Sequence, residues 1–175
     1  YTVDVDRIAI VDAGSLTLDV DDIRKKFRHQ GTCLIGKFIC YGTPRFTRTQ
    51  HQSDIQKVVE LFHARGYPAV RVRSDFDPVM SLDRRTKKVR FSLTIDQRRR
   101  FEVVFEGYNP NSVSPDQLKK QLTFAQASST DDVEANESAR AIATYLQSRG
   151  YFDTRVTWTR ERFNVFDRLI YRIDQ

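Results

Sequence analysis

The chain has 175 residues, of which 39% are hydrophobic and 30% are charged, which is typical of a folded globular protein and excludes a disordered or collagen-like chain. Its net charge is +6, but basic and acidic residues are interleaved, so we interpret the charge as an ordinary solvated surface rather than a nucleic-acid or lipid-binding one. No apolar run approaches the ~20 residues of a membrane-spanning helix, and no signal peptide stands at Tyr1, as expected of a mature form or an excised piece.

The first half of the chain opens with a strand and a helix. Ile8 and Ile10 alternate with other residues, which predicts a short half-buried strand. Asp19 can cap a helix that buries Ile23 and Phe27.

A second helix follows in the first half, and we expect a capping box of Thr49 and Gln52 at its start. Gly66 ends this helix, because glycine tolerates the left-handed conformation that closes a helix. The helix has an apolar stripe of Ile55, Val58, Val59 and Phe62. Two alternating strands follow, one with Val70 and Val72, the other with Val89, Phe91, Leu93 and Ile95.

The second half has the same order of elements. A strand carries Phe101, Val103 and Phe105, and Ser114 with Gln117 forms a capping box at the start of a helix. A polar loop is expected over 125–132. The second helix then runs to about Arg149, with an apolar stripe of Ala139, Ile142, Ala143 and Leu146, and ends at Gly150. Two strands are predicted over 152–160 and 167–174.

The two halves form an internal repeat. Residues 64–72 read Ala-Arg-Gly-Tyr-Pro-Ala-Val-Arg-Val, and residues 148–156 read Ser-Arg-Gly-Tyr-Phe-Asp-Thr-Arg-Val. The second helices superpose at a shift of 84 residues (139 against 55) and the first helices at about 95, so the first half has an insertion at about 32–48. We therefore predict two modules, 1–97 and 98–175.

The modules meet at Arg98-Arg99-Arg100 without a flexible linker. We interpret this triplet as a solvated, semi-rigid hinge, and a contact with a phosphate or a lipid headgroup is the alternative.

The β-α-α-β-β order with Arg-Gly-Tyr after the second helix resembles the POTRA (polypeptide-transport-associated) domain, most closely over 53–97, 98–122 and 134–175. The resemblance implies an α+β fold: two tandem modules, each a three-stranded mixed sheet packed against two helices. Tandem POTRA domains are typical of the periplasmic arm of BamA- and TamA-type proteins, which assemble outer-membrane β-barrels. Two-partner secretion transporters and chloroplast import channels carry related arms and are the alternative.

In the POTRA family the third strand is central, which implies open edges at Val70–Asp75 and Thr154–Arg160. An open edge can accept an extended client strand through its backbone, which suits a receiver of unfolded barrel proteins. The candidate contact residues are Val70, Arg71, Val72, Arg73, Thr154, Arg155, Val156, Thr157 and Trp158.

Other interpretations of these edges remain open. Arg71, Arg73, Arg155 and Arg160 could block unwanted pairing, Trp158 could be a packing residue, and the arm could be a spacer only. Tyr67 and Tyr151 are expected to wedge between helix and sheet. The resemblance also implies accessory subunits or neighbouring POTRA domains as partners, a following membrane β-barrel, and a periplasmic location.

Both cysteines, Cys33 and Cys40, fall in the insertion. If the chain folds back at Gly36-Lys37, the two sulfurs come within reach of a disulfide, which an oxidising periplasm would favour. Two free thiols are the alternative. A zinc site of His29, Cys33, Cys40 and His51 matches no common spacing.

We find no signal for catalysis, a cofactor or a metal. The sequence contains no phosphate-binding glycine loop and no hydrolase or metalloprotease motif. It also lacks the Gly-x-x-Gly loop and the strand aromatics of small RNA-binding modules, which argues against a nucleic-acid partner. The sequence therefore predicts a polypeptide-binding arm that is not an enzyme.

Overall fold

The structure is a computed structural model, and it describes residues 1–3, 8–11, 16–27, 32–34, 39–41 and 46–174. The chain divides into two compact units, which are treated separately below. The first unit comprises Tyr1–Phe62 and Arg71–Gln97, and the second comprises His63–Val70 and Arg98–Gln175.

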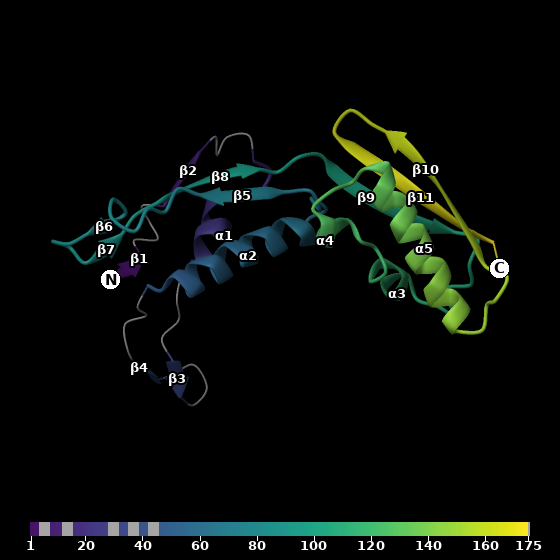
Figure 1. The fold of residues 1–175 in the computed structure, drawn as a ribbon, viewed down its shortest axis with the longest axis horizontal. Helices are drawn as coiled ribbons and strands as arrows, with labels where there is room; N and C mark the ends of the chain where they lie inside the picture. Colours follow the sequence, from purple (N-terminus) through teal and green to yellow (C-terminus); the bar gives the residue numbers. More distant parts are fainter. Residues whose placement is uncertain (4–7, 12–15, 28–31, 35–38, 42–45, 175) are drawn as a thin grey trace. The chain divides into compact units, whose positions relative to one another are not determined.

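The sheet of the first unit has the order β2-β8-β5, with β8 in the centre, parallel to β2 and antiparallel to β5 (Figure 1). The helix α1 and most of α2 lie in the same compact unit as this sheet. Asp19 caps α1 through its side chain, as expected. The bounds of these elements are β2 Ala9–Val11, α1 Val20–Lys25, α2 Arg48–Ala64, β5 Arg71–Ser74 and β8 Ser92–Asp96.

Two expectations for the first unit are wrong in detail. The helix α2 begins at Arg48, and Thr47 rather than Thr49 caps it, since the Thr47 hydroxyl accepts a hydrogen bond from the Gln50 N–H. The expected strand over 89–95 is split, because its first part, β7, belongs to a second small sheet of order β1-β7-β6. The bounds are β1 Thr2–Val3, β6 Leu82–Asp83 and β7 Lys88–Val89.

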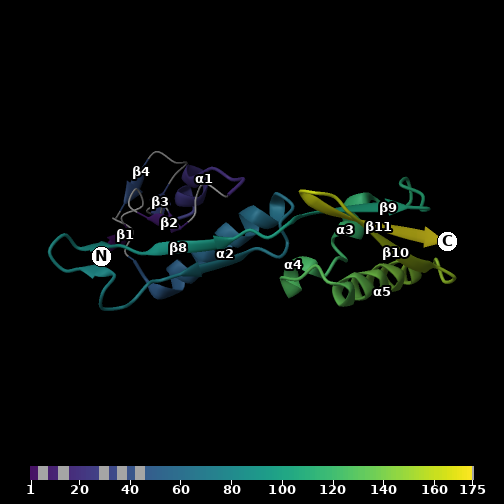
Figure 2. The ribbon, with the colours of Figure 1, turned by 90° about the horizontal axis from the view of Figure 1, so that it is seen from above.

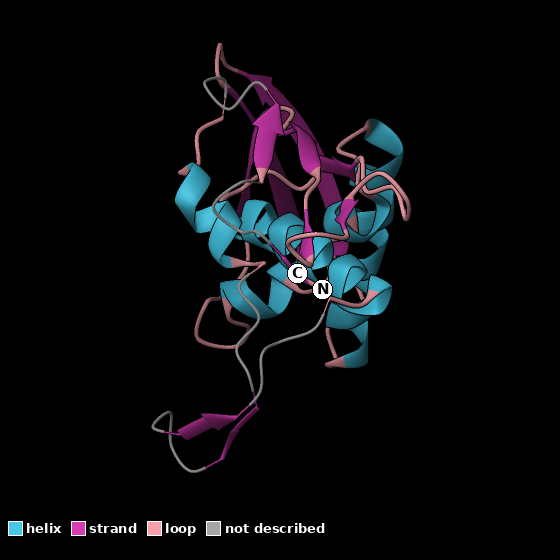
Figure 3. Ribbon diagram, turned by 90° about the vertical axis from the view of Figure 1, so that its left-hand side faces the viewer, coloured by secondary structure: helices cyan, strands magenta, loops and turns pink. Residues whose placement is uncertain are grey.

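The insertion between the helices of the first unit contains a β-hairpin. Its strands β3 (Thr32–Leu34) and β4 (Ile39–Tyr41) are antiparallel, and Cys33 lies directly opposite Cys40 in the register. Figure 3 shows the two strands side by side. The expected fold-back at residues 36 and 37 lies outside the described residues.

The second unit has the sheet order β10-β11-β9, with β11 in the centre, parallel to β9 and antiparallel to β10. The helix α5 runs alongside β10 (Figure 2). The bounds are β9 Arg100–Glu106, α3 Pro115–Lys119, α4 Phe124–Ala127, α5 Asp132–Ser148, β10 Arg155–Arg162 and β11 Phe166–Asp174.

The capping box of Ser114 and Gln117 is present at α3. The expected polar loop is wrong in its first half, because α4 occupies residues 124–127. Phe124 explains the extra helical turn, since its ring is buried and packs edge-on against Phe101 at 4.9 Å.

The core of the second unit lies between α5 and the sheet. Every second residue of β11 from Leu169 onwards is buried against the helix, and Tyr171 donates a hydrogen bond to the Ala135 carbonyl at 3.0 Å. The α+β fold class, with three-stranded mixed sheets and helices packed on them, is therefore confirmed.

Candidate polypeptide-binding edge

The predicted client-binding edges are strands β5 and β10, which occupy the same position in each unit. Strand β5 pairs with β8 on one side, and β10 pairs with β11 on one side; within the described residues, the opposite side of each has no strand partner. Strand β5 has four residues and β10 has eight. The N–H and C=O groups along such an edge can pair with an added strand, and β10 offers twice the length.

The expected edges begin one residue too early. Val70 and Thr154 precede β5 and β10 and are buried, with 3% and 5% of their surface exposed. The Thr154 hydroxyl donates a hydrogen bond to the Tyr151 carbonyl at 2.8 Å, which closes the turn before β10. These two residues therefore support the start of each edge and do not lie on it.

The remaining predicted residues lie on the edges and alternate in direction. Val72, Val156 and Trp158 are half-buried on the helix side, as expected for a period of two. The exposed residues between and beside them are Arg71, Arg73, Arg155 and Thr157.

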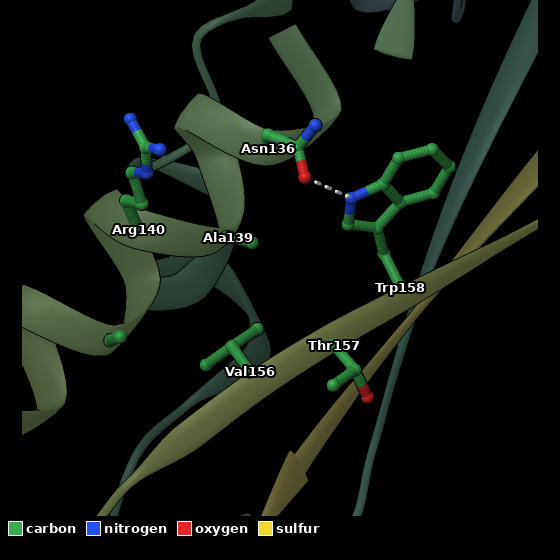
Figure 4. Close-up of a pocket in the computed structure, with 7 residues that line it drawn as sticks. Asn136, Ala139, Arg140, Val156, Thr157 and Trp158 are labelled. Carbon is green, nitrogen blue, oxygen red and sulfur yellow. Dashed lines mark hydrogen bonds between the residues drawn. The ribbon is translucent and has the colours of Figure 1, made fainter. Parts of the chain in front are cut away.

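A groove of about 400 Å³ lies between β10 and α5 (Figure 4). In the figure Val156 and Trp158 rise from β10 toward the helix. The groove is lined by Val156, Thr157 and Trp158 from the strand and by Asn136, Ala139, Arg140 and Ala143 from the helix.

Trp158 closes one end of this groove. Its indole N–H donates a hydrogen bond to the Asn136 side-chain oxygen at 2.9 Å, across the gap between strand and helix. The ring also packs against the core of the second unit. Trp158 is thus a packing residue, as one interpretation held, and it is also a wall of the groove.

Arg160 is not a blocking charge on the free edge. Only 13% of its side chain is exposed, and its guanidinium pairs with Asp132 at 3.0 Å and donates to the Thr130 carbonyl at 2.7 Å. It therefore fastens β10 to the start of α5. Arg155 is exposed, so the interpretation of a blocking charge stays open there and at Arg71 and Arg73.

The expected place of Tyr67 and Tyr151 between helix and sheet stays a prediction. Tyr67 is buried, and Tyr151 is half-buried against the core of the second unit. The arginines of the triplet Arg98–Arg100 are all exposed, as expected of a solvated segment, and two of them also form ion pairs, Arg99 with Asp167 at 3.0 Å and Arg100 with Glu102 at 3.4 Å.

Sequence reasoning missed the helix side of the groove. Ala139 and Ala143 were assigned to the apolar stripe, and Asn136 and Arg140 were not singled out. The signal lies in the repeat: α5 begins 84 residues after α2 (132 against 48), so Ala139 and Ala143 correspond to Ile55 and Val59. The smaller side chains leave space beside β10.

The described residues contain no cluster of three His, Cys, Asp or Glu side chains suited to a metal ion. The considered zinc site includes His29, which lies outside the described residues. In the same part of the chain, none of the helices is both long and apolar enough to cross a bilayer.

Comparison with known sequences finds a family match within the second unit. The sequence model of the POTRA family, described as "surface antigen variable number repeat", matches residues 102–175. Residues 102–175 form a POTRA domain. The resemblance drawn from the Arg-Gly-Tyr repeat is confirmed for this domain, and no curated protein matches the chain.

Several solved POTRA structures are similar. The chain is 18% identical to BamA POTRA3-5 of Haemophilus influenzae, with a TM-score of 0.36. The match covers 100% of the present chain and 61% of the BamA chain. It is 17% identical to POTRA1-2 of the periplasmic domain of Omp85 from Anabaena, with a TM-score of 0.36. This match covers 98% of the present chain and 93% of the Omp85 chain. The chain thus spans less than two thirds of the BamA fragment.

Proposed function

We propose that the chain is the periplasmic arm of an outer-membrane β-barrel assembly protein, built from tandem POTRA modules at 1–97 and 98–175. The arm receives unfolded outer-membrane proteins by strand addition and has no catalytic role. The observation that carries the proposal is the eight-residue open edge of β10 beside a groove in the identified POTRA domain.

Strand addition explains why an edge and a groove occur together. A client strand would lie about 4.8 Å from β10 and pair with it through backbone groups, which need no particular client sequence. Every second client side chain would then face α5. Ala139, Ala143 and Val156 provide an apolar floor at that place, so the groove would accept one apolar side chain of the client.

The pattern of a barrel strand fits this arrangement. Strands of outer-membrane barrels alternate apolar and polar residues over about ten positions. One apolar side chain would enter the groove, while the polar ones would face solvent beside Arg155 and Thr157. Binding would be weak, because a single added strand buries little surface and a flexible client must be ordered.

The edge of β5 would be a secondary site. It has the same position in the first unit, and Val72 occupies the place of Val156, but it is shorter and Ile55 and Val59 stand where the alanines do. Further partners of the arm would be accessory subunits or neighbouring POTRA domains, with a membrane β-barrel following in the full-length protein.

The state of the cysteine pair and the kind of client distinguish the proposal from its alternatives. A periplasmic arm would hold Cys33 and Cys40 as a disulfide, and their direct opposition in β3 and β4 supports this pairing. The arm of a two-partner secretion or organelle import protein would share the edge and differ in its client. A basic nucleic-acid-binding module would bind RNA in a salt-dependent way.

The chain offers an intrinsic test of strand addition. Trp158 is its only tryptophan and forms a wall of the groove, so its fluorescence reports on occupancy. We expect a ten-residue peptide of alternating apolar and polar residues, copied from a barrel strand, to change this emission saturably with a Kd of about 0.1–1 mM.

Groove-filling variants make the test specific. Ala143→Leu should raise the Kd of the peptide about tenfold, equivalent to about 1.4 kcal/mol of binding free energy. Thr144→Leu adds a similar side chain at an exposed position of α5 outside the groove lining and should leave binding unchanged. Equal effects of both variants, or no emission change in the parent chain, would refute strand addition at β10.

A further inference from the structure

The second compact unit contains both copies of the Arg-Gly-Tyr segment, one within His63–Val70 and the other after α5. Their glycines adopt the same left-handed backbone, with φ of +89° at Gly66 and +98° at Gly150. Few residues other than glycine adopt this conformation. The two loops can therefore be compared position by position within one unit.

The first loop is covered by the start of β9. The Phe101 N–H donates a hydrogen bond to the Gly66 carbonyl at 2.8 Å. A β-carbon placed on Gly66 would lie 3.4 Å from the Phe101 carbonyl oxygen and 3.5 Å from the Arg100 side chain. Tyr67 beside it is buried and Pro68 is half-buried. The loop thus holds the first residues of a strand.

The second loop is open. Apart from Gly150 and its two chain neighbours, no described residue has an atom within 4 Å of the position that a β-carbon on Gly150 would occupy. No described residue gives the Gly150 carbonyl a hydrogen bond like that from Phe101 to Gly66. Phe152, which corresponds to Pro68 at the shift of 84, is 79% exposed. The same loop therefore occurs once with a strand on it and once without.

We propose that the loop Arg149–Phe152 docks the first strand of a further module of the same type. The N–H at the start of that strand would bind the Gly150 carbonyl, and its chain would cover the Phe152 ring. This inference rests on the proposed function, in which the chain is an arm of repeated POTRA modules, and it specifies how a neighbouring module would be held.

The repeat also gives the register of this contact. Asp96 ends β8 and Asp174 ends β11, each within the repeated Ile-Asp-Gln sequence. Phe101 follows Asp96 by five positions. A docking residue five positions after Asp174 would therefore reach the Gly150 loop as Phe101 reaches the Gly66 loop.

A duplicated chain tests the proposal directly. A second copy of residues 98–175 is appended after Gln175. Asp174-Gln175 is then followed by the Arg98 of the appended copy, as Asp96-Gln97 is followed by the original Arg98. Hydrogen exchange is then measured at both copies of the Phe101 amide. We expect the appended Phe101 amide to be protected within about tenfold of the original one, because the two would share the same kind of acceptor.

The original junction serves as a control within the same molecule. Gly150→Val places a β-branched side chain at φ +98°, which distorts the second loop alone. It should accelerate exchange at the appended Phe101 amide by at least about tenfold and leave the original unchanged. Appended Phe101 exchanging at the rate of an unprotected amide, or an appended copy that stays unfolded, would overturn the proposal.

The result is separable from that for client binding. The Trp158 titration uses the 175-residue chain without an appended copy, so either proposal can fail while the other holds. If the barrel-strand peptide shifts the amide signals of Gly150 and Phe152 in that chain, the loop is a client site, and the assignment to a neighbouring module is wrong.

Discussion

The two edge strands differ in what lies beside them. Beside β5, Ser74 bonds to His51 at 3.0 Å, and the His51 ring contacts Phe46, Phe76 and Phe91. At β10 the corresponding helix positions hold alanines and a groove remains. The two edges thus share a scaffold and differ in the side chains beside them, and we infer that the alanines of α5 leave the room for side chains at β10.

This difference shows how a repeat can be used for two tasks. The backbone edge is a property of the fold, whereas the groove is a property of side-chain size on α5. We infer that the second unit carries the main client contact and that the first unit serves mainly as its support. The predictions below test the two units against each other.

The largest effect is expected from the cysteine pair in the first unit. A Cys33–Cys40 disulfide should stabilise this unit by roughly 2–3 kcal/mol in the chain-entropy view, less any strain. Cys33→Ser should remove this gain under oxidising conditions, while the second unit is unaffected. Urea unfolding of oxidised and reduced protein measures the gain, and two free thiols after oxidative refolding would contradict it.

An exchange of groove residues should alter binding without altering the fold class. Ala139→Leu should lower peptide affinity at β10 about tenfold, or about 1.4 kcal/mol, because its side chain would occupy the groove. Ile55→Ala with Val59→Ala should open space beside β5 at a cost in stability, since apolar contacts are lost. Peptide titrations of both variants, followed by amide shifts, decide whether helix side-chain size controls each edge.

Tyr171 should make the second unit sensitive to alkaline pH. Burial raises the pKa of its phenol well above the usual value of 10, so the folded state keeps a proton that the unfolded chain releases. Stability is then fully present below about pH 10 and falls as the pH rises above it. Leu93 holds the matching position of β8, so the first unit lacks this dependence there.

Tyr171→Phe measures that dependence. The free energy of unfolding of the variant should be about 1 kcal/mol lower at neutral pH, because the hydrogen bond to the Ala135 carbonyl is lost. It should also lose less stability than the parent between about pH 10 and 11.5, a range near the ordinary tyrosine pKa. Parallel pH profiles of parent and variant would show that the buried phenol does not contribute.

The smallest effect is expected at the bond that closes the groove. Trp158→Phe keeps an aromatic ring and removes the N–H that bonds to Asn136. This loss should lower the free energy of unfolding by about 0.5–1 kcal/mol. Asn136→Ala should cost a similar amount. A double-mutant cycle followed by circular dichroism measures their coupling, and additive losses would mean that the bond contributes nothing.

The repeat made much of this fold predictable. The helix stripes, Gly66, Gly150 and the capping box at Ser114 define the elements of both modules, and the POTRA resemblance supplied the central third strand. Strands β1 and β6 were not predicted, because two residues are too few to show a period. Thr49 was predicted as the cap because Gln52, three residues later, completes a capping-box pattern, whereas the helix begins at Arg48 and Thr47 caps it.

The site was predictable only in part. The edge strands follow from topology, so Arg71–Arg73 and Arg155–Trp158 could be placed from sequence. The groove could not, because alanines on a helix stripe fit a packed core as well as an open space. Only their distance from β10 distinguishes the two, and that distance depends on how α5 packs against the sheet.

The most direct test of the central claim is an amide-shift titration of the whole chain with the barrel-strand peptide and, in parallel, with a short RNA. Our account predicts peptide-induced shifts concentrated at Arg155–Trp158 and at Ala139 and Ala143, smaller shifts at Arg71–Ser74, and none with RNA. Tight, salt-sensitive shifts with RNA and none with peptide would contradict it.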